Sequence, residues 1–175
     1  RLLRQMHFQK DAELVMTTDY YEPPSEPEDE NHVGDMSAAY AHAVHVAEVE
    51  VDTDTGEVRV LRVTSAQDVG RIVNLTGLEG QVEGGIAMGL GYALSEELKI
   101  VEGRVLNPSF RDYKVPTAPE MPELDLHFVE SQSATGPLGA KGIAELPTIV
   151  IAPAIANAVH NAIAIRFPKP PLTPE

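Results

Sequence analysis

Several residue types that build common functional sites are missing from this chain of 175 residues, or are rare in it. Cysteine is absent, which excludes disulfide bonds and cysteine-ligated iron–sulfur clusters within the chain. Tryptophan is absent and aromatic residues make up only 5%, so the core must be built mainly from Ala, Val, Ile and Leu. Lys and Arg number 13 against 27 Asp and Glu, a formal net charge of −14. This balance argues against partners with dense negative charge, namely nucleic acids and anionic membrane surfaces.

The length of 175 residues suits one domain, or a piece of a larger one, and the 43% of hydrophobic residues can fill a core. The chain starts with Arg rather than Met and ends on Pro-Leu-Thr-Pro-Glu, so we expect both ends to be cuts rather than natural termini. No signal peptide is visible, and we expect a cytoplasmic protein. Residues 146–165 are long enough to span a bilayer, but prolines, asparagines and a histidine interrupt them. This pattern predicts a buried helix.

The first part of the chain differs in composition from the rest. We predict that residues 1–38 form an extended segment and an acidic loop, and that residues 39–175 form the folded domain. A loose alternation over residues 11–22 predicts an extended strand. The stretch 22–35 is acidic and contains three prolines, which predicts a mobile, solvated connection, with an interaction tail as the functional alternative.

The later residues show alternating strand patterns and longer helical ones. Residues 39–51 and 57–66 flank a turn at 52–56, so a β-hairpin is predicted there. Further elements are predicted as a helix over 75–98, a short hairpin over 99–105, a strand over 124–130, and a helix over 153–165 with Pro153 in its first turn. Because these elements do not repeat as βαβ units, the predicted fold class is α+β, with helices packed on a mixed or mainly antiparallel sheet.

Residues 136–145 (GPLGAKGIAE) carry the strongest functional signal. Their glycines allow a backbone to approach a ligand closely, and successive N–H groups can form a concave site for an anion. Lys141 adds a positive charge, and Glu145 stands just before the predicted helix, where a carboxylate is a candidate general base. The structural alternative is an ordinary glycine-rich loop that binds nothing.

A second segment, residues 79–91, places five glycines inside a helical pattern. Each interior glycine costs a helix about 1 kcal/mol relative to alanine. So many glycines predict that something approaches the backbone closely. That neighbour is either a ligand or another helix, and helix packing explains the pattern at least as well.

Other polar residues receive structural interpretations. His42 and His45 are three apart on a predicted strand and point to opposite faces, and no histidine spacing matches a zinc site, so no protein-ligated metal is expected. Asp68 and Arg71 are predicted to form an ion pair that brackets a turn. Asn74 is predicted to cap the helix that follows it.

Four segments together resemble the C-terminal part of the molybdenum cofactor-binding large subunit in the xanthine dehydrogenase/aldehyde oxidase family. They are residues 68–74 (DVGRIVN), 79–85 (EGQVEGG), 136–145 and 152–158 (APAIANA). Their order and spacing match that subunit, and the likeness runs from about residue 39 to the final LTPE. The resemblance implies that residues 39–175 are the C-terminal portion of a molybdopterin-binding domain, and thus a fragment of a larger subunit.

The resemblance also implies an activity and a base. The complete enzyme would hydroxylate a carbon centre of an N-heterocycle or an aldehyde with oxygen from water. Glu145 would lie next to the molybdenum and remove a proton from the attacking oxygen group. Many relatives have Gly immediately before this glutamate, whereas this chain has Ala144. Because Ala does not readily adopt positive φ, this departure leaves the direction of the Glu145 side chain less certain.

Cofactor contacts are implied for five more residues. Gln81, with the neighbouring Gly80, would contact the cofactor close to the metal, since an amide can both donate and accept. Ala140, Lys141 and Gly142 would contact the pterin and its phosphate tail. The protein itself would supply no metal ligand.

The implied cofactor is molybdopterin with molybdenum, in the cytosine dinucleotide form by its bacterial-type pattern, while FAD and iron–sulfur clusters belong to other domains or subunits. The implied partners are the remaining half of the molybdenum subunit, iron–sulfur and flavin subunits, and a small-molecule substrate, in an oligomer. We therefore expect the isolated chain to be inactive and to expose apolar surface. One alternative is a non-catalytic assembly module that docks on a partner subunit. Another is a nucleotide-binding domain that uses Lys141 on phosphate, which is weaker because no Walker or Rossmann spacing occurs.

Overall fold

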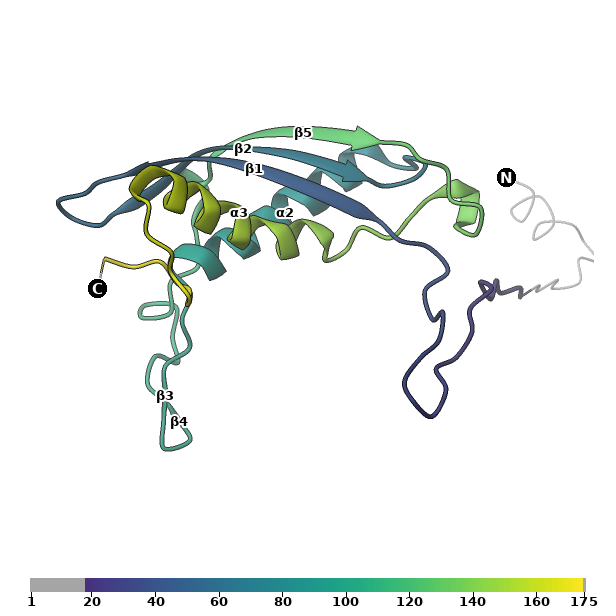
Figure 1. The fold of residues 1–175 in the computed structure, drawn as a ribbon, viewed down its shortest axis with the longest axis horizontal. Helices are drawn as coiled ribbons and strands as arrows, with labels where there is room; N and C mark the ends of the chain where they lie inside the picture. The colour runs from purple at the N-terminus through teal and green to yellow at the C-terminus, as the bar shows by residue number, and fades with distance from the viewer. Residues whose placement is uncertain (1–17, 175) are drawn as a thin grey trace, which may run out of the picture.

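The predicted hairpin forms the centre of the computed structural model, which describes residues 18–174 (Figure 1). Strand β1 (His42–Val51) pairs antiparallel with β2 (Val58–Asp68). The turn between them is closed by Asp52, whose Oδ1 accepts hydrogen bonds from the N–H of Asp54 at 2.8 Å and of Thr55 at 3.0 Å. Short acidic side chains stabilise turns in this way, so the local sequence favours the hairpin.

The third strand makes the sheet mixed. Strand β5 (Glu123–Val129) pairs parallel with β2, and the strand order is β1-β2-β5. Burial alternates along most of each strand, so one face carries buried residues such as Val63 and the other is open to solvent. Val44 and Val46 on the open face are 65% and 59% exposed. The α+β class is therefore confirmed, and the expected exposure of apolar side chains is present.

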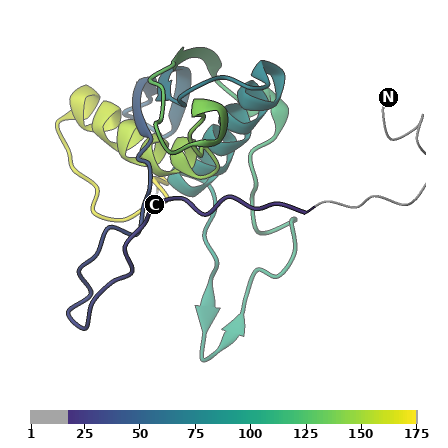
Figure 2. The same cartoon turned by 90° about the vertical axis from the view of Figure 1, so that its right-hand side faces the viewer.

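Two helices cover the inner face of the sheet (Figures 1 and 2). They are α2 (Leu75–Leu94) and α3 (Leu146–Ile163). Asn74 caps α2 as predicted, because its Oδ1 accepts a hydrogen bond from the N–H of Gly77 at 3.1 Å. The core lies between the helices and the sheet and is built mainly from branched aliphatic residues: Val60, Val63, Val82, Ile86, Leu90, Ile151, Ile155 and Val159.

Helix α3 begins at residue 146, the start of the predicted buried helix 146–165, and seven residues before the start at residue 153 that the second prediction gave. Pro147, not Pro153, lies in its first turn, where the missing N–H is not needed. Pro153 lies inside the helix on an exposed position, so the carbonyl that loses its helical partner can face solvent. The helix is also buried along only one stripe, at residues 147, 151, 155 and 159, while Ile149 is 64% exposed.

In length and apolar composition alone, α3 is the one helix within the described residues that is suited to cross a membrane. Its buried stripe contacts α2 and β1, as the apolar face of a core helix does.

Two segments project from the core (Figure 2). One is the predicted short hairpin of β3 (Ile100–Val101) and β4 (Arg104–Val105), with Glu102 and Gly103 at positive φ in its turn. The other is the acidic stretch 22–35, which has no helix or strand. Residues 11–17 of the strand predicted over 11–22 lie outside the described residues, and residues 18–22 form no strand. The division of the chain at residue 38 stays a prediction.

Candidate functional site

Two of the motifs, residues 68–74 and 136–145, meet at the end of β2, where the loop before α3 passes beside it. Arg71 N–H donates to the carbonyl of Gly139 at 2.9 Å, and Lys141 N–H donates to the carbonyl of Val69 at 2.9 Å. These bonds surround a bridge between Gly70 and Ala140. Gly70 has φ 61°, and a Cβ at this position would collide with the carbonyl oxygen of Gly139. Glycine is therefore required for segments 68–74 and 136–145 to approach so closely.

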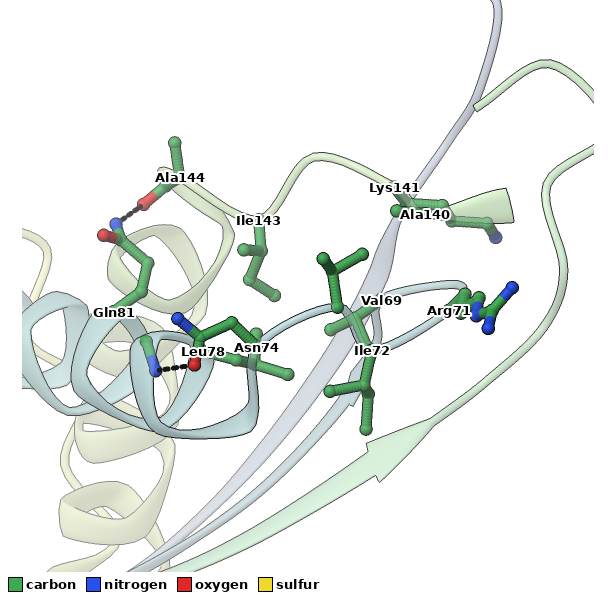
Figure 3. A pocket seen from close by; sticks show the side chains of 12 residues that line it. Val69, Arg71, Ile72, Asn74, Leu78, Gln81, Ala140, Lys141, Ile143 and Ala144 are labelled. Carbon is green, nitrogen blue, oxygen red and sulfur yellow. Dashed lines mark hydrogen bonds between the residues drawn. The ribbon is translucent and has the colours of Figure 1, made fainter. Parts of the chain in front are cut away.

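A pocket of about 380 Å3 opens beside this contact (Figure 3). Its floor is apolar and includes Val69, Ile72 and Ile143. Gln81 lines it from α2, and Lys141 and Arg71 lie at the opposite end with their charged groups directed away from the centre. The predicted site residues Gln81, Ala140 and Lys141 therefore share one pocket, whereas Gly80, Gly142 and Glu145 are not among the residues that line it.

Gln81 connects α2 to the residue that precedes the predicted base. Its Nε2 donates to the carbonyl of Ala144 at 2.7 Å (Figure 3). Ala144 is not among the residues with positive φ, which in this loop are Leu138 at 57° and Gly139 at 83°. Replacement of Gly by Ala at this position is thus compatible with an unstrained backbone.

Glu145 occupies the N-cap position of α3, and its side chain is exposed and makes no capping hydrogen bond. Its carbonyl accepts hydrogen bonds from the N–H groups of Thr148 at 3.0 Å and Ile149 at 3.2 Å. Within residues 18–174 its carboxylate has no hydrogen-bond or salt-bridge partner. The backbone is therefore fixed while the acidic group is open to a ligand.

The glycines near this position fall into two groups. A Cβ on Gly85 would collide with Pro147, and one on Gly89 would collide with the side chain of Ile151. These glycines serve helix packing. A Cβ on Gly80, Gly84 or Gly142 would meet no atom of residues 18–174 within 4 Å, apart from its chain neighbours and the helix's own backbone. Packing among these residues does not explain this second group, which lies close in sequence to Gln81 or to Glu145.

The predicted ion pair between Asp68 and Arg71 is wrong. Asp68 Oδ2 lies 2.7 Å from Lys141 Nζ instead. Ser131 completes the cluster, since its Oγ accepts a hydrogen bond from Lys141 Nζ at 2.9 Å and lies 2.6 Å from Asp68 Oδ2. These hydrogen bonds, first from Lys141 and then from Ser131, hold the pKa of Asp68 well below its usual range. Sequence reasoning missed Lys141 as the partner because 73 residues separate it from Asp68.

A second polar cluster lies on the inner face of the sheet and was not predicted. Gln67 is fully buried; its Nε2 donates to Ser65 Oγ at 2.9 Å and lies 3.0 Å from His45 Nε2. His42 lies on the opposite, exposed face, so the predicted separation of the two histidines is confirmed. Burial lowers the pKa of His45 to about 4, which keeps the ring neutral near pH 7. Within the described part of the chain, no three His, Asp or Glu side chains gather as a metal site.

Comparison with known proteins identifies relatives of this arrangement. The sequence profile of the family described as "Molybdopterin cofactor-binding domain" matches residues 1–122. The xanthine dehydrogenase molybdenum-binding subunit of Escherichia coli O157:H7 is 41% identical over 130 residues, which are 73% of this chain and 17% of that protein. The 6-hydroxypseudooxynicotine dehydrogenase complex subunit gamma of Paenarthrobacter nicotinovorans is 39% identical over 140 residues, 78% of this chain and 18% of that protein.

Solved structures agree with these sequences. The aldehyde oxidoreductase of Desulfovibrio gigas superimposes with a TM-score of 0.80 and 32% identity, over 86% of this chain and 16% of that one. This chain therefore spans less than a fifth of the length of each of these relatives.

Proposed function

Because this chain belongs to the molybdopterin cofactor-binding family of xanthine dehydrogenase and aldehyde oxidoreductase large subunits, we propose that it is part of a molybdenum hydroxylase. The substrate class is an N-heterocycle or an aldehyde. In the overall reaction a carbon centre exchanges a hydrogen for a hydroxyl group from water and gives up two electrons and two protons. The electrons pass to iron–sulfur and flavin groups on partner domains or subunits.

The residues of this chain fit a flat, polar cofactor. The bare backbone at Gly80, Gly84 and Gly142 leaves space that a side chain would otherwise fill. The amide of Gln81 stands beside two of these glycines, and its Oε1 is available as an acceptor since Nε2 is already bound to Ala144. When bound, molybdopterin, in the cytosine dinucleotide form of our proposal, would supply the redox-active metal.

The loop would bind the cofactor mainly through Gly142. The N–H of Ala140 donates to Pro137 at 3.0 Å and that of Lys141 donates to Val69 at 2.9 Å. Ala140 and Lys141 thus shape the loop, while the N–H of Gly142 is directed to no acceptor within residues 18–174. Gly80 and Gln81 would contact the cofactor from α2.

Glu145 would act as the base. Its carboxylate would accept a proton from the oxygen nucleophile that derives from water. The hydrogen bond from Gln81 to Ala144 is the observation that best supports this role, because it joins α2 to the residue before Glu145. This contact supports the proposal that α2 and the residue before Glu145 belong to one site.

Glu145→Gln in the complete enzyme tests the role of this residue. Gln is nearly isosteric but cannot take up the proton, so we expect the rate per bound molybdenum to fall by about 10²–10⁴-fold, the range for loss of a general base. Molybdenum content should stay near that of the parent. Glu102→Gln makes the same chemical change at the exposed turn of the β3–β4 hairpin and should retain the rate. Retention of more than about a tenth of the rate in Glu145→Gln, far above that range, would show that Glu145 is not the base.

The alternative is a non-catalytic assembly module that docks on a partner subunit. Exposed apolar side chains favour docking, since Val44 is 65% exposed on the open sheet face and Phe110 is 82% exposed near the β3–β4 hairpin. Molybdenum analysis of this chain, co-expressed with the remaining subunit and its partners, separates the two functions. Stoichiometric metal that is lost in Gly142→Leu supports the enzyme. Metal content that is unaffected by this change supports the module.

A further inference from the structure

The lysine in the glycine-rich loop does not extend toward open space. Its side chain is only 12% exposed, and that of Asp68 is 16% exposed. Lys141 Nζ lies 2.7 Å from Asp68 Oδ2 and donates to Ser131 Oγ at 2.9 Å. A shielded lysine that is already paired with a carboxylate has little charge left to offer a phosphate, because a neighbouring anion cancels most of its field.

The ion pair between Asp68 and Lys141 joins the end of β2 to the loop before α3, and backbone hydrogen bonds join the same two segments. Lys141 N–H donates to Val69, the residue next to Asp68, and Gly70 bridges to Ala140. Asp68 also accepts a hydrogen bond from the N–H of Gly70 at 3.2 Å. The same carboxylate therefore holds its own turn, the loop and, through Ser131, the segment that follows β5.

This connection lies close to Glu145. Lys141 is fixed to the end of β2, and three residues later Ala144 is fixed to Gln81 of α2. Between them Ile143 packs against the hydrophobic core. The backbone that leads into Glu145 is thus held at both ends, so its position depends on the ion pair at one end as much as on the amide at the other.

We propose that Asp68, Lys141 and Ser131 form a positioning unit that anchors the loop before Glu145 to the end of β2. In this unit the carboxylate of Asp68, not an anionic ligand, is the partner of the Lys141 charge. The functional part rests on the proposed role of Glu145. None of the three side chains needs to touch substrate. The hydrogen bonds from Lys141 and Ser131 lower the pKa of Asp68, so its carboxylate is ionised throughout the neutral range.

The test compares Asp68→Asn, Lys141→Met and their double variant in the complete enzyme. An anchor predicts that each single change lowers the rate per bound molybdenum by a similar factor, about tenfold, and that the double variant is no worse than either, since contacting residues couple strongly. Asp125→Asn is the matched control. Asp125 lies on neighbouring β5 and pairs at 3.1 Å with His127, not with the loop. It should retain the parent rate.

Hydrogen exchange gives a readout that does not depend on activity. Asp68→Asn and Lys141→Met should each speed exchange of the Arg71 and Lys141 amides about tenfold or more, the effect of about 1.4 kcal/mol on local opening, while Asp125→Asn should not. Lys141→Arg keeps the charge and should restore most of the protection.

The outcomes separate this proposal from the assignment of Lys141 to the phosphate tail. If Lys141 binds that tail, Lys141→Met will lower molybdenum content while Asp68→Asn, which frees the lysine, will leave content, rate and exchange unchanged. That result would overturn the anchor. Faster exchange with an unchanged rate per metal would overturn the positioning role and leave only a structural one. If Glu145→Gln itself stays active, the proposed function fails, and the exchange experiment alone decides whether the anchor exists.

Discussion

The two halves of α2 use the same residue type for opposite purposes. In the half nearer its C-terminus, Gly85 and Gly89 let α3 approach so closely that a methyl group would collide with Pro147 or Ile151. In the half nearer its N-terminus, Gly80 and Gly84 have no atom from another part of the described structure within 4 Å of where a side chain would begin. The difference shows that a glycine-rich helix cannot be assigned to packing or to binding as a whole. Each position has to be judged by what occupies the space beside it.

Gly89→Ala tests the packed half and should have the largest effect on stability. The added methyl group must displace the Ile151 side chain or the backbone of α3, and overpacking of this kind costs about 1–3 kcal/mol. The gain in helix propensity, about 1 kcal/mol, should offset only part of it. Urea unfolding measures the net loss, and a variant as stable as the parent would show that α3 yields without cost.

Gly84→Ala tests the open half and should change stability in the opposite direction. No atom opposes the methyl group, so the chain should gain up to about 1 kcal/mol in unfolding free energy from helix propensity. If the space belongs to the cofactor, molybdenum content of the complete enzyme should fall in the same variant. Gains in both stability and metal content would contradict the assignment of this surface to binding.

The smallest expected effect is on the pH dependence of stability. It compares His45, on the buried face of the sheet, with Asp68 at the site. The pKa of His45 is lowered to about 4 in the folded state, against about 6.5 in an unfolded chain. The unfolded state thus binds more protons between these values, and stability should fall as pH decreases from about 6.5 to about 4.

The slope from His45 cannot exceed about 1.4 kcal/mol per pH unit for one proton, and it should be smaller because the ring is only half-buried. His45→Gln should flatten unfolding curves within this window. Asp68 acts separately. Because its pKa is depressed below 3.8, the stability it contributes is present above that value and is lost only as pH falls further. A flat curve between pH 6.5 and 4 in the parent would show that His45 is not desolvated as described.

Most of the fold was predictable because its signals are local. Alternation and turn residues predicted the β1–β2 hairpin and β5, and Asn74 predicted the start of α2. The sequence left two starts for α3, at residues 146 and 153, because Pro147 and Pro153 both fit the first turn of a helix, and the structure shows that Pro153 lies inside it.

The candidate site was less accessible to sequence reasoning. Residue types and spacing singled out the glycine-rich segment 79–91 and the loop 136–145, the family resemblance singled out Gln81, and the structure brings Gln81 and the loop together. Their roles came from the family resemblance, and these roles stay predictions. The partner of Lys141 was not predictable, since Arg71 is three residues from Asp68 whereas Lys141 is 73 away. Local spacing favours the near residue, and only the tertiary fold shows that the distant one is bound.

The parallel pairing of β2 with β5 has a consequence for the order of assembly during folding. It joins Arg62 to Glu123, which are 61 residues apart, and the loop of the site joins β2 only beyond that point. Closure of so long a loop must overcome chain entropy before its contacts stabilise it. The β1–β2 hairpin, with its short turn, can form as soon as its own residues have been synthesised. The surface around Glu145 is therefore expected to form after the β1–β2 hairpin, once β5 and the loop that follows it have been synthesised.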